Sequence, residues 1–304
     1  MNLLELPREQ WLLLRAAHAT SAAARVDPHL ARRACGERHP IDDFLWDYYP
    51  FSTGKFRLWN PGATTLLLGY TRADGDLPTG FVITNRGARC DLSSLTDAAL
   101  TRLQHEVGWV RRLLSGTRER TAGFGCFGLH EWAMLLGQTQ DGYRHQSWPL
   151  RVTQEQIAAT VDEVGLRCTH FDAWRFFTPE SLLRNPWSHS RESQPEWDQG
   201  GCLHANMDLY KWSMRLQPLV ASDFVMRAFD LALRIRQLDM AASPYDFRHL
   251  DVAAIAVETP DGRVAFARQQ REFAREADEL RAELLSELDE LSHAMPLLNA
   301  TLTQ

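Results

Sequence analysis

The sequence predicts a mainly α-helical fold with a small β component (α+β), built as one globular domain over residues 1–304. Most of the chain places apolar residues at helical spacing, and only a few short runs have the pattern of strands. Of the 304 residues, 44% are apolar, which is enough to bury a substantial core. We find no internal repeat and no low-complexity tract. The expected fold is therefore a helical core that carries a minor sheet.

Three segments in the first half of the chain have a clear helical pattern. Residues 8–34 are rich in Ala, Leu and Arg, and the pattern ends where a Gly and a Pro follow. A short amphipathic helix is expected over residues 41–49, between two prolines. Residues 93–114 place Leu and Val on one side, and Asp91 or Ser93 can cap this helix.

The strand predictions are confined to short runs. Residues 63–70 and 81–85 are joined by the turn-rich stretch 72–80, which predicts a hairpin. Residues 167–177 alternate enough to predict a further strand. That strand would place His170, Asp172 and Trp174 on one side. The Pro- and Ser-rich residues 179–199 are expected to form a long loop, and such loops often cover functional sites.

The net charge of −6 comes from one segment near the C-terminus. Residues 276–291 contain seven acids and only one basic residue, Arg281. They belong to an expected acidic helix over residues 264–291, whose apolar stripe could pack internally or form a dimer seam. A non-catalytic interaction protein that uses this helix is therefore one of the functions to consider.

The rest of the chain is close to neutral, so a basic surface can exist locally. The clearest cluster consists of four arginines: Arg111, Arg112, Arg118 and Arg120. These residues could contact DNA phosphates or simply solvate the end of a helix and its loop.

The cysteine content and the hydropathy of the chain limit the classes of protein to which it could belong. Five cysteines at wide spacing indicate neither a disulfide framework nor a paired-cysteine zinc site. No apolar run approaches the roughly 20 residues that a membrane span requires. We therefore expect a cytoplasmic protein without membrane contact.

Residues 201–215 concentrate chemically capable side chains on one expected helix. Its apolar stripe contains Leu203, Met207, Tyr210 and Met214, and the polar stripe beside it contains His204, Asp208, Lys211 and Arg215. Partial burial at the edge of a core can shift the pKa values of such groups toward values useful in catalysis. We expect His204, Asp208 and Lys211 to line one pocket, with Asn206 and Trp212 nearby. The alternative is a structural network between helices.

Two further clusters join a histidine to carboxylates. In residues 39–51, Asp43 and Asp47 share a helix face, and Asp42, Trp46 and Tyr49 lie on the next one, after His39. In residues 123–134, three glycines precede His130 and Glu131, and glycines let a backbone approach a ligand closely. Either cluster could instead be structural. We expect His130-Glu131 and His170-Asp172 to converge on one cavity.

The same histidines and carboxylates could hold a metal ion. Its candidate ligands are His39, His130, Glu131, His170, His204 and Asp208, with Asp172 beside them. The chain has no His-Glu-x-x-His sequence, and it does not contain the two Glu-x-x-His sequences that a di-iron bundle uses. Because no local signature decides the matter, the metal content stays open at this stage.

Six stretches of the sequence resemble one known family. They are residues 39–44, 48–51, 128–134, 169–178, 202–212 and 242–246, so the resemblance covers nearly the whole chain. The family is an actinobacterial one commonly labelled 3-methyladenine DNA glycosylase. The resemblance implies an enzyme that cleaves the N-glycosidic bond of alkylated purines in DNA, with no cofactor. An aromatic pocket would bind the cationic base, and a carboxylate would stabilise the sugar cation.

Applied to this chain, that function assigns roles to the clustered residues. The catalytic candidates are Asp208, His204, Lys211 and Glu131. The substrate-binding candidates are His39, Asp43, Trp46, Tyr49, His130, His170, Asp172, Asn206 and Trp212. The four arginines would contact DNA. The alternative is a metal-dependent enzyme, an oxygenase among the options, that requires a divalent metal and acts on a small molecule.

Overall fold

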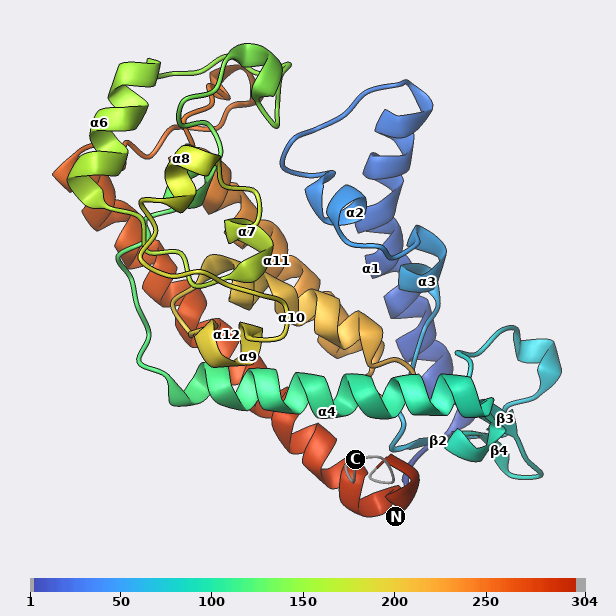
Figure 1. The fold of residues 1–304 in the computed structure, drawn as a ribbon. Coiled ribbons are helices and arrows are strands. Elements are labelled where there is room, and N and C mark those ends of the chain that lie inside the picture. Colours follow the sequence, from blue (N-terminus) through green and yellow to red (C-terminus); the bar gives the residue numbers. More distant parts are fainter. Residues whose placement is uncertain (1–2, 299–304) are drawn as a thin grey trace. The chain divides into compact units, whose positions relative to one another are not determined.

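The computed structural model describes residues 3–298 and is mainly helical with one small sheet (Figure 1). The longer helices are α1 (Arg8–Ala34), α4 (Asp97–Glu119), α6 (Gln154–Val164), α10 (Leu203–Arg215), α11 (Ser222–Ala242) and α12 (Pro260–Ala294). The short helices are α2 (Phe44–Tyr48), α3 (Thr53–Arg57), α5 (Leu129–Ala133), α7 (Phe171–Trp174), α8 (Pro179–Leu182) and α9 (Gln194–Trp197). The strands are β1 (Leu4–Leu6), β2 (Thr65–Leu68), β3 (Phe81–Ile83) and β4 (Gly87–Cys90). The predicted fold class is confirmed.

Short 3₁₀ helices lie between or after these elements, at Arg72–Asp74, Leu92–Ser94, Gln140–Gly142, Arg248–Leu250 and Pro296–Leu298. The Leu92–Ser94 turn explains why α4 begins later than its sequence pattern suggests. Asp91 accepts a hydrogen bond from the Ser93 amide at 3.1 Å and so caps this turn instead of α4.

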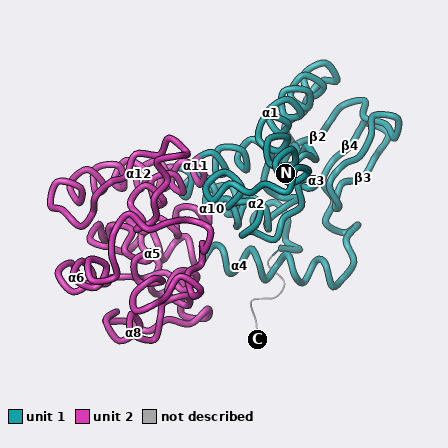
Figure 2. Tube along the Cα trace, turned by 90° about the horizontal axis from the view of Figure 1, so that it is seen from above, with its two compact units in different colours: residues 1–112, 209–230, 280–304 teal, residues 113–208, 231–279 magenta. Residues whose placement is uncertain are grey.

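The chain divides into two compact units, shown in Figure 2. Unit 1 contains residues 1–112, 209–230 and 280–304, and unit 2 contains residues 113–208 and 231–279. Both units are assembled from segments far apart in the sequence, and α4, α10, α11 and α12 contribute residues to both. The single globular domain expected from the sequence stays a prediction.

The sheet belongs to unit 1 and has the order β1-β2-β4-β3. β1 is parallel to β2, and the other pairs are antiparallel. The sheet packs on a core cluster of Trp11, Trp59, Leu67, Tyr70 and Ala88. The Trp11 indole donates to the Leu68 carbonyl at 3.0 Å, which ties α1 to β2.

The predicted hairpin between residues 63–70 and 81–85 is wrong, because β4 pairs with both β2 and β3 and lies between them. β4 follows β3 through a tight turn in which the Thr84 amide donates to the Gly87 carbonyl at 2.7 Å. Gly87 has φ 143°, and a Cβ at this position would overlap the Leu67 carbonyl. Only glycine lets β4 approach β2 so closely.

The predicted strand over residues 167–177 is also wrong. His170 is the N-cap residue of the one-turn helix α7, and Asp172 lies in its first turn. A carboxylate is favoured there because the first amides of a helix are unpaired and carry partial positive charge. Residues 179–199, expected to be a long loop, contain the short helices α8 and α9. The acidic segment lies within α12.

Candidate metal centre

Unit 2 contains a histidine-rich cluster, and glycines fix where two of its helices, α5 and α10, begin. α5 begins after Gly128, which has the left-handed φ of 71° that favours glycine. α10 follows Gly201, where a Cβ would overlap the Gly123 carbonyl. The Gln199 side-chain oxygen accepts hydrogen bonds from the amides of Gly123 and Gly201, both at 2.7 Å. These contacts set where α10 starts and therefore where His204 lies.

Three side chains of unit 2, from α5, α10 and α11, form a group that we call the His130 group: His130, His204 and Asp239. Each offers one ligand atom, and these atoms lie within 4.8 Å of one another. The His130 Nε2 and Asp239 Oδ1 atoms are 2.8 Å apart. Both atoms are buried, and neither completes a hydrogen bond with suitable angles. The His204 ring is perpendicular to the His130 ring, with centroids 4.4 Å apart.

Arg236 fixes the orientation of two carboxylates in this region, those of Asp239 and Glu131. Its Nη1 donates to Asp239 Oδ2 at 3.0 Å and to Glu131 Oε1 at 2.9 Å. The guanidinium is 2% exposed, so both ion pairs are shielded from solvent. Such outer contacts fix how a carboxylate presents its other oxygen. For Asp239 that other oxygen is Oδ1, which faces His130.

Burial and nearby charges shift the pKa values of His204 and His130 in opposite directions. Burial is the main cause that lowers the pKa of His204 well below 6.5, and the neighbouring His130 lowers it further. Burial also disfavours the charged form of His130, but the Asp239 carboxylate outweighs burial and raises the pKa of His130. Asp239 itself has a lowered pKa, because His130 and Arg236 overcome the effect of burial. The cluster therefore presents a neutral His204 imidazole and an ionised Asp239 carboxylate, both of which are suitable metal ligands, whereas a protonated His130 has to release its proton when it binds an ion.

A second set of unit 2 side chains, the His170 group, contains His170, Asp172 and Asp208, again with one ligand atom each within 4.8 Å. His170 Nδ1 shares a 2.9 Å hydrogen bond with Asp198 Oδ1. His170 Nε2 is buried without a hydrogen-bond partner and lies 3.8 Å from Asp208 Oδ2. The His170 ring stacks on the His204 ring with centroids 5.5 Å apart, so the two groups are neighbours.

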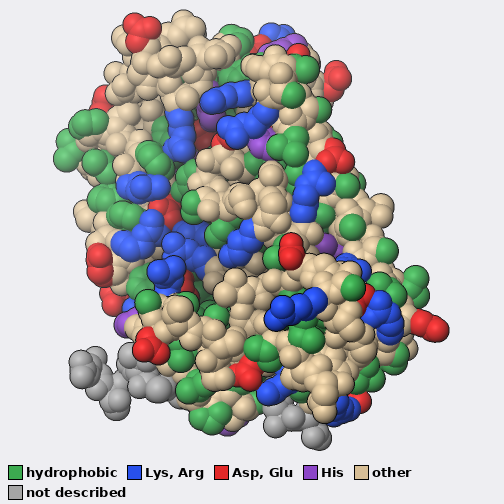
Figure 3. All heavy atoms as spheres, turned by 90° about the vertical axis from the view of Figure 1, so that its right-hand side faces the viewer, with side chains coloured by type: hydrophobic (Ala, Val, Ile, Leu, Met, Phe, Trp, Pro, Cys, Tyr) green, Lys and Arg blue, Asp and Glu red, His purple; other side chains and the backbone are tan. Residues whose placement is uncertain are grey.

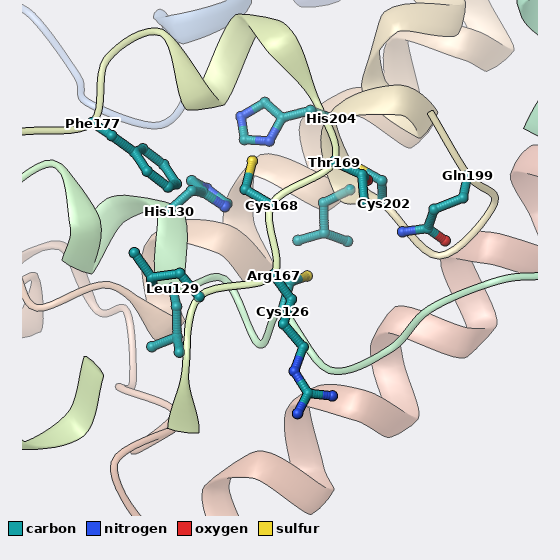
Figure 4. A pocket seen from close by; sticks show the side chains of 12 residues that line it. Cys126, Leu129, His130, Arg167, Cys168, Thr169, Phe177, Gln199, Cys202 and His204 are labelled. Carbon is teal, nitrogen blue, oxygen red and sulfur yellow. The ribbon is translucent and has the colours of Figure 1, made fainter. Parts of the chain in front are cut away.

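A small cavity opens beside the His130 group (Figure 4). It has a volume of about 20 Å³, and its walls include His130, His204, Cys126, Cys168 and Cys202. This volume accommodates about one water molecule or one ion and is far too small for a purine base. Burial is the main cause that raises the pKa of all three thiols, so they are protonated at neutral pH.

The structure brings together the predicted site residues of unit 2: His130, Glu131, His170, Asp172, His204 and Asp208. Asn206 is fully buried in the same helix and donates to the Gly200 carbonyl at 3.0 Å. His130 is among the residues that line the small cavity. The convergence of His130-Glu131 and His170-Asp172 on one cavity stays a prediction.

The other predicted site residues belong to unit 1: His39, Asp43, Trp46, Tyr49, Lys211 and Trp212. Within unit 1, Asp43 accepts hydrogen bonds from Arg32 and from the His39 amide, and His29 Nδ1 lies 2.9 Å from it. Trp46 packs against Phe56 and Phe229. Lys211 Nζ lies 4.4 Å from the centre of the Trp212 ring. A shared pocket for Lys211 with Asp208 and His204 stays a prediction.

Sequence reasoning missed part of the unit 2 cluster. The residues Asp239, Arg236, Asp198 and Arg191 are not among the site residues predicted from the sequence. Arg236 and Asp239 are three residues apart on α11, so helical spacing together with an Arg–Asp pair in an apolar segment is the signal that could have found them. Nothing comparable in the sequence points to Asp198.

Three of the four clustered arginines are engaged inside their own unit. Arg111 pairs with Asp289 in unit 1. In unit 2, Arg118 pairs with Asp278, and Arg120 donates to the Asp198 carbonyl at 2.8 Å. On the face in Figure 3, Lys and Arg side chains are interspersed with Asp and Glu side chains.

Comparison of the chain with protein-family models, curated proteins and solved structures finds no match. Within residues 3–298, no helix is both long and apolar enough to span a bilayer.

Proposed function

We propose that this protein is a metal-dependent enzyme whose ion is held by His130, His204 and Asp239. The observation that carries the proposal is the 2.8 Å approach of His130 Nε2 to Asp239 Oδ1, two buried atoms without hydrogen bonds. Ligands about 2.1 Å from one ion, at angles near 90°, lie about 3 Å apart. The close approach thus has the spacing of two ligands of a common cation.

The donor set favours a transition metal. Two imidazoles and one carboxylate form the triad typical of non-haem iron(II) oxygenases, which leaves coordination positions for substrate. Zinc and manganese accept similar donors. When bound, such an ion would act as a Lewis acid or as the centre of oxygen chemistry. Asp239 would be held by Arg236, and the buried Glu131 beside it is the candidate proton acceptor.

The size of the cavity favours a small substrate. A space of about 20 Å³ admits one small group at a time unless side chains move. The proposal is therefore a reaction on a small molecule, or on a small reactive end of a larger one.

Metal analysis of the purified full chain tests this function. We expect at least one equivalent of iron, manganese or zinc by mass spectrometry of the metal, and one equivalent less in Asp239→Asn and in His130→Gln than in the native chain. Asp246→Asn is the matched control, because this carboxylate of unit 2 pairs with Arg248 and belongs to neither ligand group. Folding of each variant is checked by circular dichroism. Folded protein that binds no metal after reconstitution would reject the proposal.

Base excision from alkylated DNA is the second candidate function. The family resemblance implies it, and the 2% exposed Asp208 supports it as a carboxylate that could stabilise a sugar cation. The size of the cavity and the internal pairing of three arginines count against it. The test is release of 3-methyladenine from alkylated duplex DNA by the native chain and by Asp208→Asn. Release that Asp208→Asn abolishes while it stays folded and bound to DNA would favour base excision.

A further inference from the structure

We propose that His170, Asp172 and Asp208 form a second cation site in unit 2, next to the ion of the His130 group. The inference rests on the proposed metal-dependent function and extends it to a two-ion centre. It gives a role to a buried cluster that the first ion does not use.

The hydrogen bond to Asp198 fixes the tautomer of a neutral His170. Its Nδ1 carries the proton that is donated to Asp198 Oδ1 at 2.9 Å, so Nε2 presents a lone pair. A carboxylate that holds the far nitrogen of a histidine is the usual outer contact of a metal-binding imidazole. Asp198 is in turn fixed by Gln194, whose side-chain amide donates to Oδ2 at 2.8 Å. Because His170 is fully buried, its ring has one orientation available.

The Nε2 atom of His170 faces the carboxylate of Asp208 in the His170 group rather than a hydrogen-bond partner. His170 Nε2 has no hydrogen-bond partner, although it is completely buried. It lies 3.8 Å from Asp208 Oδ2, too far for a hydrogen bond but within the span of two ligands of one ion. Leaving a buried polar atom without a partner is costly. A cation between this nitrogen and the two carboxylates would satisfy it.

Two arginines orient the carboxylate of Asp172, in the same way that Arg236 orients the carboxylate of Asp239. Arg191 donates through both terminal nitrogens to Asp172, with Nη1 to Oδ2 at 2.7 Å, and Arg175 Nε lies 3.1 Å from Asp172 Oδ1. These contacts fix the orientation of the Asp172 carboxylate beside His170. One nitrogen and two carboxylate oxygens favour manganese, iron or zinc over calcium, which prefers oxygen donors alone.

The two sites are adjacent because His204 lies against both histidines. Its ring is 4.4 Å from that of His130 and 5.5 Å from that of His170, centroid to centroid. A reaction at the first ion could therefore be influenced directly by charge at the second. Two-ion centres use such proximity to stabilise charge on two substrate atoms at once.

Counting bound ions in single-site variants tests the inference. The full chain is stripped with chelator, titrated with Mn²⁺ by calorimetry, and its bound metal is then measured after dialysis. We expect two equivalents in the native chain and one in Asp208→Asn and in His170→Gln. Asp239→Asn should also retain one equivalent, and the double variant Asp208→Asn/Asp239→Asn none. His189→Gln is the control with two equivalents, because this largely buried histidine hydrogen-bonds to the Cys168 carbonyl, packs against two indole rings and belongs to neither ligand group.

The outcomes separate the two proposals. One equivalent that Asp239→Asn removes and Asp208→Asn retains would overturn the second site and leave the proposed function standing. One equivalent that Asp208→Asn removes and Asp239→Asn retains would overturn the assignment of the first site instead. No bound Mn²⁺, with Fe²⁺ and Zn²⁺ also negative, would overturn both. If Asp208→Asn does not fold, Asp172→Asn and His170→Gln provide the same comparison.

Discussion

Arg236 holds one oxygen of Asp239 at 3.0 Å, one helical turn along α11, and so leaves the other oxygen facing His130. The same guanidinium nitrogen also binds Glu131. Arg236 is therefore the residue that compensates two buried carboxylates of unit 2.

Removing Arg236 should destabilise the protein strongly. Arg236→Met leaves Glu131 and Asp239 buried with less compensation, and breaking a buried pair from one side costs about 3–5 kcal/mol. Urea denaturation measures the loss in the free energy of unfolding. The control is Arg234→Met on the same helix, which breaks a solvent-exposed pair with Glu276 and should cost no more than about 1 kcal/mol. Equal effects of the two substitutions would show that Arg236 has no special structural role.

Asp43 should make the protein sensitive to strong acid. Burial raises its pKa, but hydrogen bonds from Arg32, the His39 amide and His29 outweigh burial and lower it from 3.8 to about 2. A group whose pKa is lower in the folded state stabilises above its unfolded pKa and loses this effect as the pH falls. The contribution, about 2 kcal/mol at neutral pH, should disappear between about pH 4 and pH 2.

The free energy of unfolding of Asp43→Asn, followed against pH, measures this contribution. The variant should lack that part of the acid-dependent loss, whereas Asp42→Asn should retain it. Asp42 is the matched control because it is the neighbouring residue and its side chain is 43% exposed. An unchanged acid profile in Asp43→Asn would contradict the assignment.

His145 should add a second pH dependence at milder acidity. Burial lowers its pKa from 6.5 to about 4. Since the unfolded chain takes up this proton more readily, stability should fall as the pH drops from about 6.5 to 4. His145→Gln should flatten the stability profile in that window, and His105→Gln, an exposed residue of α4, should not. Parallel profiles for native protein and His145→Gln would argue against the shift.

Gly201→Ala should disturb the start of α10. The added Cβ would overlap the Gly123 carbonyl. The segments that contain Gly123 and Gly201 must therefore move apart, which would displace the start of α10 and His204. We expect a loss of about 1–3 kcal/mol in unfolding free energy, typical of overpacking, together with weaker metal binding. Gly200→Ala is the control, since its Cβ would meet only the Ala122 Cβ at 3.8 Å. Thermal denaturation and metal titration of both variants check this, and indistinguishable behaviour would refute it.

The sequence by itself determined the helices α1, α4, α10 and α12 and the spacing of two candidate site residues on α10. Periodicity found α1, α4 and α12 because a long helix repeats its apolar spacing many times, and it placed His204 and Asp208 one turn apart on α10. It failed for β4 and α7, since four residues carry too little pattern to separate strand from helix. The pattern of apolar and polar residues identifies a helix or strand only where it repeats over several turns or residue pairs.

Only the tertiary structure decided which side chains meet. His130, His170, His204 and Asp239 come from four separate segments, and no spacing rule relates them. Their contact depends on packing between those segments, such as the Gly123–Gly201 crossing, and on partners such as Asp198 and Arg236 that fix ring and carboxylate orientation. The sequence could name capable residues. The burial that leaves His130 Nε2 and His170 Nε2 without hydrogen-bond partners, and so makes them candidate ligand atoms, arises from long-range packing.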